Sequence, residues 1–159
     1  MSHAPSASIA REFRAISLVG FGHFLSHFYM FGLVPLFVAI SAEFEVTNLQ
    51  LGAILTAYNV ATGVLQTPMG MLVDKLGAKR VLVSGLFITS AAFALSGFTT
   101  SYWELLALFF IAGAGNSVFH PADYVILTAS VDESRQGRAY SMHSFGGSLG
   151  TAAGPAVMV

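Results

Sequence analysis

Long apolar stretches separated by short polar segments make up most of the chain. They predict five membrane-spanning helices, at residues 15–40, 48–73, 81–98, 102–131 and 137–159. Each stretch can supply the about 20 residues that a helix needs to cross the hydrocarbon of a bilayer. A helix is favoured there because every backbone N–H and C=O needs an internal partner, and the stretches lack the alternation that is typical of membrane β-strands.

The two ends of the chain differ in character. Residues 1–14 are small, polar and partly basic, and we expect them to form a disordered cytoplasmic tail. The following stretch is longer than the apolar core of a signal peptide, about 7–15 residues, so we interpret it as a retained first span. The last residues up to Val159 are still apolar, which favours a partial chain.

Basic residues occur only in alternate connecting segments and in the tail. The seven are Arg11, Arg14, Lys75, Lys79, Arg80, Arg135 and Arg138. The other two connecting segments, 41–47 and 99–101, contain none. Because Lys and Arg accumulate on the cytoplasmic side of a membrane protein, this distribution predicts a multi-pass protein of the cell membrane with a cytoplasmic N-terminus.

Composition supports the same interpretation. Hydrophobic residues make up 55% of the chain and charged residues only 9%, against about 25% charged in a typical soluble domain. The lipid bilayer is therefore the expected partner of this surface. A net charge of −1 gives no electrostatic footprint for nucleic acid. The absence of cysteine excludes disulfides, thiolate metal sites and cysteine nucleophiles.

The segment between the second and third stretches carries a motif with a plausible physical role. Its members are Gly70, Asp74, Lys75, Gly77, Lys79 and Arg80. Gly70 lets another helix approach its backbone closely, and Gly77 permits a sharp reversal. Asp74 could accept hydrogen bonds from a helix N-terminus. The alternative is a solvated turn whose charges only set the topology.

The run Gly70-Met-Leu-Val-Asp-Lys-Leu-Gly-Ala-Lys-Arg80 resembles the signature loop of the major facilitator superfamily, G-x-L-x-D-[RK]-x-G-[RK]-[RK]-[RK], with Ala78 in place of a base. The resemblance implies an all-α integral membrane fold in which these five helices are part of an N-terminal six-helix half. It also implies that Asp74, with Lys75 or Arg80, acts as a state-dependent latch between two halves. Stretches 22–29 and 119–147 look closest to fosmidomycin-resistance-type efflux proteins.

Polar residues inside the stretches are candidates for a substrate or proton site. An ionisable group at the middle of the bilayer costs about 2.5–3.5 kcal/mol on insertion scales, so its presence there indicates a structural or functional role. His23 and His27 lie one helical turn apart on one face of the first stretch. A histidine titrates in the physiological range. The alternative is that each neutral ring only hydrogen-bonds a neighbouring helix.

Two further stretches carry candidates of the same kind. These are Asn59 and Gln66 in the second stretch, and Asn116, His120 and Asp123 in the fourth. The spacing predicts that the last three form one polar stripe, in which Asp123 could pair with His120 or with Arg138. Pro121 within the stripe removes a backbone donor and favours a bend.

The fifth stretch is rich in small residues at helical spacing, namely Gly146, Gly150 and Gly154, followed by Pro155. Small residues spaced by four let two helix backbones pack closely in lipid. The pattern resembles part of the superfamily's glycine-rich antiporter motif, G-x-x-x-G-P. We expect His143 in this stretch to be a packing or interface residue rather than a proton carrier.

Motifs that would indicate catalysis are missing from the sequence. It contains no G-x-x-x-x-G-K-[ST] phosphate loop, no H-E-x-x-H pair and no G-x-S-x-G elbow. His120 and Asp123 alone are too few for a catalytic metal site, which takes three protein ligands. We therefore expect no enzyme activity, no cofactor and no metal.

These observations predict a secondary active transporter of a small organic solute that works by alternating access, with efflux slightly favoured over uptake. A proton is the expected coupling ion, and His23, His27 and Asp123 are the candidate titrating groups. An R-x-x-Q-G pattern on the fourth helix is absent, which weakens proton antiport as an inference from the family. The partners would be the remaining C-terminal helices. The alternative is a truncated, non-transporting membrane fragment or interaction module that needs a partner.

Overall fold

The computed structural model describes residues 6–158, with side chains described from Ile9 onward. All regular structure in this part is helical. The elements in chain order are α1 (Ser6–Gly32), η1 (Val34–Leu36), α2 (Phe37–Phe44), α3 (Asn48–Leu76), α4 (Ala78–Ser96), α5 (Tyr102–Asn116), α6 (Phe119–Ser130), η2 (Glu133–Arg135) and α7 (Gln136–Val157).

The five expected stretches correspond to five helical passes. Three segments of the described chain are long and apolar enough to cross a bilayer, namely Ile9–Phe44, Ala78–Ser96 and Tyr102–Ser130. Helices α3 and α7 are 29 and 22 residues long, and their polar and small residues make them less apolar. The expectation of a disordered tail was wrong for residues 6–14, which belong to α1, while residues 1–5 lie outside the described part.

Local sequence explains where the helices begin and end. Thr47 and Gln50 form a capping box at the start of α3, because each side chain accepts a hydrogen bond from the other residue's backbone N–H. Gly77 alone separates α3 from α4 and has a φ of 88°, in the region that favours glycine. The expected connection at residues 74–80 is therefore mostly helix, with the reversal confined to one residue.

The fourth stretch is two helices rather than one. Helix α5 ends at Asn116, and α6 begins at Phe119 after a turn at Ser117 and Val118. Pro121 lies in the first turn of α6, where its missing N–H leaves the Ser117 carbonyl without an i+4 helical partner. The bend that Pro121 predicted is present as a break just before it.

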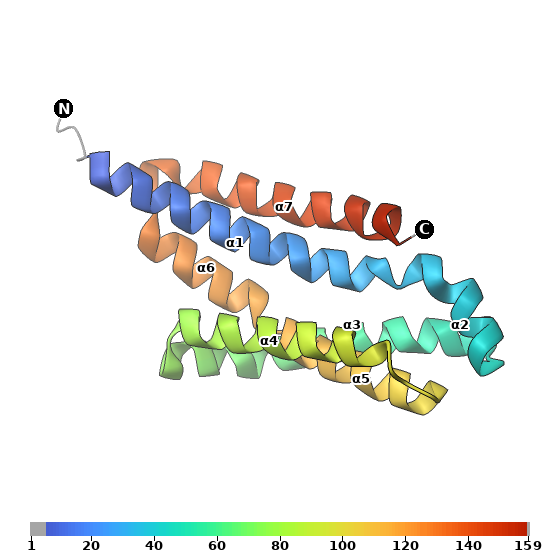
Figure 1. Ribbon diagram of the computed structural model, residues 1–159. Coiled ribbons are helices and arrows are strands. Elements are labelled where there is room, and N and C mark those ends of the chain that lie inside the picture. The colour runs from blue at the N-terminus through green and yellow to red at the C-terminus, as the bar shows by residue number, and fades with distance from the viewer. Residues whose placement is uncertain (1–5, 159) are drawn as a thin grey trace.

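Figure 1 shows two groups of helices joined by α6. Helix α7 packs along α1, and α5 packs against both α3 and α4. Helix α6 crosses from the second group to the first and contacts α1, α3, α4 and α7. This crossing brings the middle of α1, the start of α6 and the middle of α7 together.

Glycines allow the closest helix contacts. A Cβ added at Gly146 or Gly150 would lie 2.4 Å from the Gly20 carbonyl oxygen or 2.2 Å from that of Phe24. Gly154 faces the Phe28 carbonyl in the same way. The backbones of α1 and α7 therefore touch along three successive turns, and Pro155 lies inside the last turns of α7. Gly85, Gly113 and Gly115, which the sequence analysis did not single out, allow the corresponding contacts of α5 with α3 and α4.

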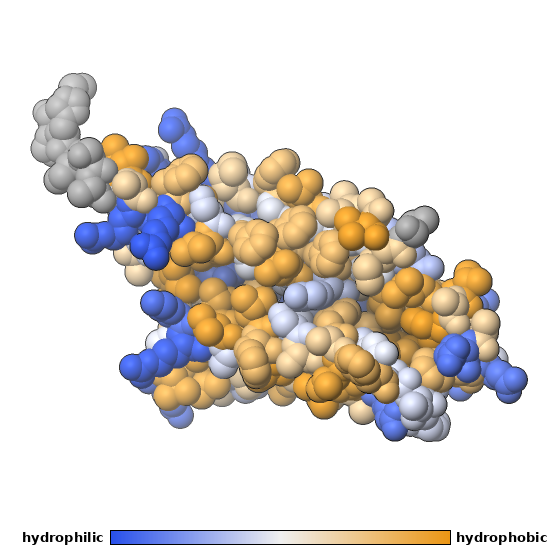
Figure 2. Space-filling view, in the orientation of Figure 1, coloured by the Kyte–Doolittle hydropathy of each residue, from blue (hydrophilic) through white to orange (hydrophobic). Residues whose placement is uncertain are grey.

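The face of the molecule shown in Figure 2 is apolar around its middle and charged at its two ends. Large side chains such as Phe87 and Trp103 are each 72% exposed. The basic residues lie at the end of the molecule that holds the start of α1, the α3–α4 reversal and the α6–α7 connection (Figure 1). An apolar girdle with charged ends is the surface expected in a bilayer.

We expect Gly150→Ala to destabilise the protein by about 1–3 kcal/mol, because the new methyl group must displace the backbone of α1. Gly137→Ala in the same helix is the matched control, since an added Cβ there has no neighbour within 4 Å. Detergent-solubilised protein would be unfolded with SDS and followed by circular dichroism. Equal unfolding midpoints for the two variants would contradict the proposed close contact.

Candidate functional site

Four histidine side chains from three helices meet inside the helical bundle. His23 and His27 come from α1, His120 from α6 and His143 from α7. The His23 ring stacks on that of His143 with centroids 3.8 Å apart, and it lies edge-on to His27 and His120 at 4.6 and 5.3 Å. The sequence analysis singled out three of these residues. His143, which it treated as a packing residue, is buried and stacks on His23, the ring that contacts all three others.

Gly147 makes room for these rings. A Cβ at this position would lie 2.6 Å from Cε1 of His23 and 3.2 Å from Cδ2 of His27. Gly147 lies one helical turn after His143 on the same face of α7, is buried, and faces the two histidines of α1. The small residues of α7 therefore set both the helix distance and the position of the histidines.

A continuous chain of polar contacts runs through His23 and His27. His23 Nδ1 donates to the His143 carbonyl oxygen at 2.9 Å, and Nε2 of His23 lies 3.2 Å from Nε2 of His27. His27 Nδ1 lies 3.0 Å from the Thr151 hydroxyl, which donates to the Gly147 carbonyl at 3.1 Å. This row of polar groups has four contacts, but neutral His23, neutral His27 and Thr151 supply only one polar hydrogen each, three in all. A fourth hydrogen would complete it and make one ring an imidazolium.

Asp123 is fully buried beside this chain. Its Oδ2 lies 3.7 Å from Nδ1 of His143, and neither carboxylate oxygen has a hydrogen-bond partner among the described residues. The expected pairing with His120 or Arg138 was wrong. The break before α6 directs Asp123 toward α7, where His143 is the nearest charged or titratable group.

The remaining polar candidates separate into different places. Asn116 accepts a hydrogen bond from the Ser26 hydroxyl and so joins α5 to α1. Gln66 lines an open groove between α3 and α6 together with His120. Asn59 is exposed, and its amide donates to the Leu55 carbonyl of its own helix. The helix break means that Asn116 does not continue one stripe with His120 and Asp123.

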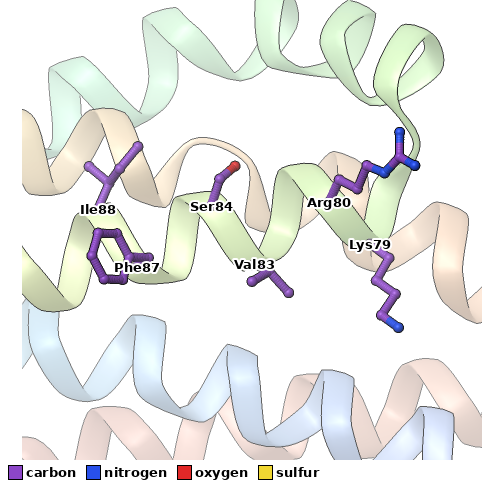
Figure 3. Close-up of a pocket in the computed structure, with 6 residues that line it drawn as sticks. All are labelled: Lys79, Arg80, Val83, Ser84, Phe87 and Ile88. Carbon is purple, nitrogen blue, oxygen red and sulfur yellow. The ribbon is translucent and has the colours of Figure 1, made fainter.

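The charged residues of the signature segment lie at the basic end, whereas its first residue, Gly70, lines the groove between α3 and α6 together with His120. Asp74, Lys75, Lys79 and Arg80 are all exposed, and none forms an ion pair within the described chain. Lys79 and Arg80 border a shallow groove along α4 that also includes Phe87, and Figure 3 shows the two basic side chains pointing in different directions. Gly70 faces Pro121, where an added Cβ would make only an ordinary contact at 3.8 Å.

An ion pair at the same end was not anticipated from the sequence. Arg135 donates from Nε and a terminal nitrogen to the two carboxylate oxygens of Glu12, at 2.9 and 2.8 Å. Hydrogen bonds from Ser134 lower the pKa of the nearby Asp132 carboxyl, which keeps its charge beside Arg135. The pair ties the start of α1 to the connection between α6 and α7. Charge alone did not reveal it, because the partners are far apart in the chain.

Comparison with known proteins identifies the family. The Major Facilitator Superfamily pattern matches residues 19–159. The chain therefore belongs to this superfamily, whose members are helical membrane transporters.

Three relatives illustrate the similarity. The Escherichia coli fosmidomycin resistance protein is 27% identical over 96% of this chain and 37% of its own length. An Escherichia coli protein named "Probable L-galactonate transporter" is 23% identical over 76% of this chain and 27% of its own length. The multidrug resistance protein MdtH of Citrobacter koseri is 28% identical over 54% of this chain and 21% of its own length. The chain thus spans little more than a third of the first of these relatives, and less of the others.

We expect Glu12→Gln and Arg135→Gln each to lower the thermal midpoint of the solubilised protein, because either change leaves a partly buried charge without its partner. The double variant should lose little more than either single one. Arg138→Gln, at an exposed position of α7, is the control and should have no effect. Strictly additive effects of the two single changes would show that the ion pair does not hold α1 in place.

Proposed function

We propose that this chain is the N-terminal part of a secondary active transporter for a small organic solute, working by alternating access. The principal support is its membership of the superfamily together with a buried polar cluster in the middle of apolar helices. Transporter sites lie near the bilayer midplane, where helices of one half face the other. The grooves beside Tyr124, one lined by Gln66 and His120 and the other by Tyr140 and His143, open this cluster toward the surface.

The coupling ion in this proposal is a proton. The contact chain through His23 and His27 has one more contact than neutral groups have hydrogens, so a bound proton would complete it between the two Nε2 atoms. Asp123 and His143 lie next to this pair and would share the change in charge. Histidine is the side chain whose unperturbed pKa lies closest to physiological pH, which makes this pair the candidate for the coupling ion.

The proposed direction is efflux. Two of the relatives are named for resistance, one to fosmidomycin and one to multiple drugs, whereas a third is named for L-galactonate. The tight glycine contacts of α7 with α1 agree with the glycine-rich motif that the superfamily associates with antiporters. These names and contacts favour export of a small organic solute in exchange for protons.

The signature segment has a separate role in this proposal. Asp74, Lys75 and Arg80 are exposed and free of partners within the described chain, so they are available to the remaining C-terminal helices of the transporter. We place this end in the cytoplasm of a cell-membrane protein, because it carries all the basic residues. The latch would then close or open at the cytoplasmic face.

We expect His27→Ala to abolish transport while the protein still reaches the membrane. The change removes both contacts of the His27 ring, to His23 and to Thr151, and with them the proposed proton position. The assay would use everted membrane vesicles that contain the complete product of the reading frame. It would measure the proton movement that follows the addition of fosmidomycin. Ser17→Ala, an exposed position of the same helix, is the control. Normal transport by His27→Ala would remove this role.

The topology can be tested with single cysteines, because the chain has none of its own. We expect Asn48→Cys to react with a membrane-impermeant maleimide in intact cells, since it lies at the end without basic residues. Glu133→Cys, at the basic end, should react only after permeabilisation. The reverse pattern would show that the N-terminus is not cytoplasmic.

A further inference from the structure

The buried polar atoms without partners are concentrated in one place. Six buried side-chain nitrogen or oxygen atoms of the described residues have no hydrogen-bond partner, and five of them belong to His120, Asp123 and His143. The sixth is the Tyr58 hydroxyl, in a separate apolar core. Buried polar groups are normally paired, so a cluster of unpaired ones needs an explanation such as a bound ion.

The nitrogen atoms are close enough for one ion. A ring nitrogen from each of His23, His120 and His143 lies within 4.8 Å of the other two. Tetrahedral zinc with bonds of about 2.0–2.1 Å holds its ligands about 3.4 Å apart. Binding of an ion therefore requires the rings to rotate from the positions that the structure shows. The stacked rings of His23 and His143 must also turn, because the nitrogen lone pairs lie in the ring planes.

Neighbouring groups prepare two of the rings for this role. His23 donates from Nδ1 to the His143 carbonyl, which leaves the lone pair of a neutral ring on Nε2. Asp123 lies 3.7 Å from Nδ1 of His143 and can orient that ring through its N–H. Metal-binding histidines commonly donate their second nitrogen to a carbonyl or a carboxylate in this way. The carboxylate would also offset part of the ion's charge.

We propose that His23, His120 and His143 bind one divalent transition-metal ion of the zinc type inside the helical bundle, with Asp123 as a positioning residue. Imidazole nitrogen suits zinc, copper, nickel and iron, whereas magnesium and calcium prefer oxygen. Three protein ligands leave a fourth position for water or for a carried solute. His23 and His143 join this ligand set from α1 and α7, so it is larger than the pair of His120 and Asp123 weighed from the sequence. Metal binding by these residues does not require the protein to transport a solute.

Cobalt titration of the detergent-solubilised chain tests this site. His3 would first be replaced (His3→Gln), and the purification tag would contain no histidine. We expect one equivalent of Co²⁺ to give the intense visible bands of four-coordinate cobalt and to be displaced by Zn²⁺. His120→Gln and His143→Gln should each weaken binding at least about tenfold, and Asp123→Asn about tenfold. His27→Gln, next to the ligands but outside the set, is the matched control and should keep the stoichiometry.

X-ray absorption of the zinc-loaded, unsubstituted chain provides a measurement that does not depend on how the variants fold. Scattering from three imidazole rings is expected. No stoichiometric binding by monodisperse protein, fewer than three imidazole ligands, or unchanged affinity in folded His120→Gln and His143→Gln would overturn the proposal. Transport measurements do not enter this test, so the site and the proposed function stand or fail separately.

Discussion

Helices α1 and α7 touch along their backbones, and this contact determines where the polar groups of the molecule meet. Gly150 brings the two helices so close that an added methyl group would lie 2.2 Å from the Phe24 carbonyl oxygen. In lipid the hydrophobic effect does not drive two helices together, so the close van der Waals packing of their backbones stabilises this pair. The same closeness places His143 against His23 and Thr151 against His27. A looser packing would leave these groups unpaired in an apolar medium.

The break between α5 and α6 is the second determinant of the site. Because the chain turns at Ser117 and Val118, α6 leaves the group formed by α3, α4 and α5 and crosses to α1. His120 and Asp123 lie on α6 and so reach α1 and α7. Asn116 lies at the end of α5 and accepts a hydrogen bond from Ser26. A straight helix would have kept all three residues on one face. The polar cluster is thus the result of an interruption in a transmembrane pass.

The polar cluster and the charged end differ in chemistry. The cluster lies among apolar helices and combines imidazoles with one carboxylate, which suits the binding of a cation, whether a proton or a metal ion. The basic end carries the signature segment and the Glu12–Arg135 ion pair, which ties α1 to the α6–α7 connection. A proton and a metal ion would compete for the same nitrogen of His23, which links the two proposals chemically.

The helical passes and the gathering of the basic residues at one end of the molecule could be predicted from the sequence, because they depend on local chemistry and on the bilayer. The resemblance carried by that segment also indicated the superfamily. Contacts across the chain could not be interpreted in this way. His143 meets both His23 and Asp123, and Glu12 pairs with Arg135. Each of these contacts joins residues that are far apart in the sequence. Helical periodicity fixes the face on which a residue lies, but only the packing of one helix on another decides what that face meets.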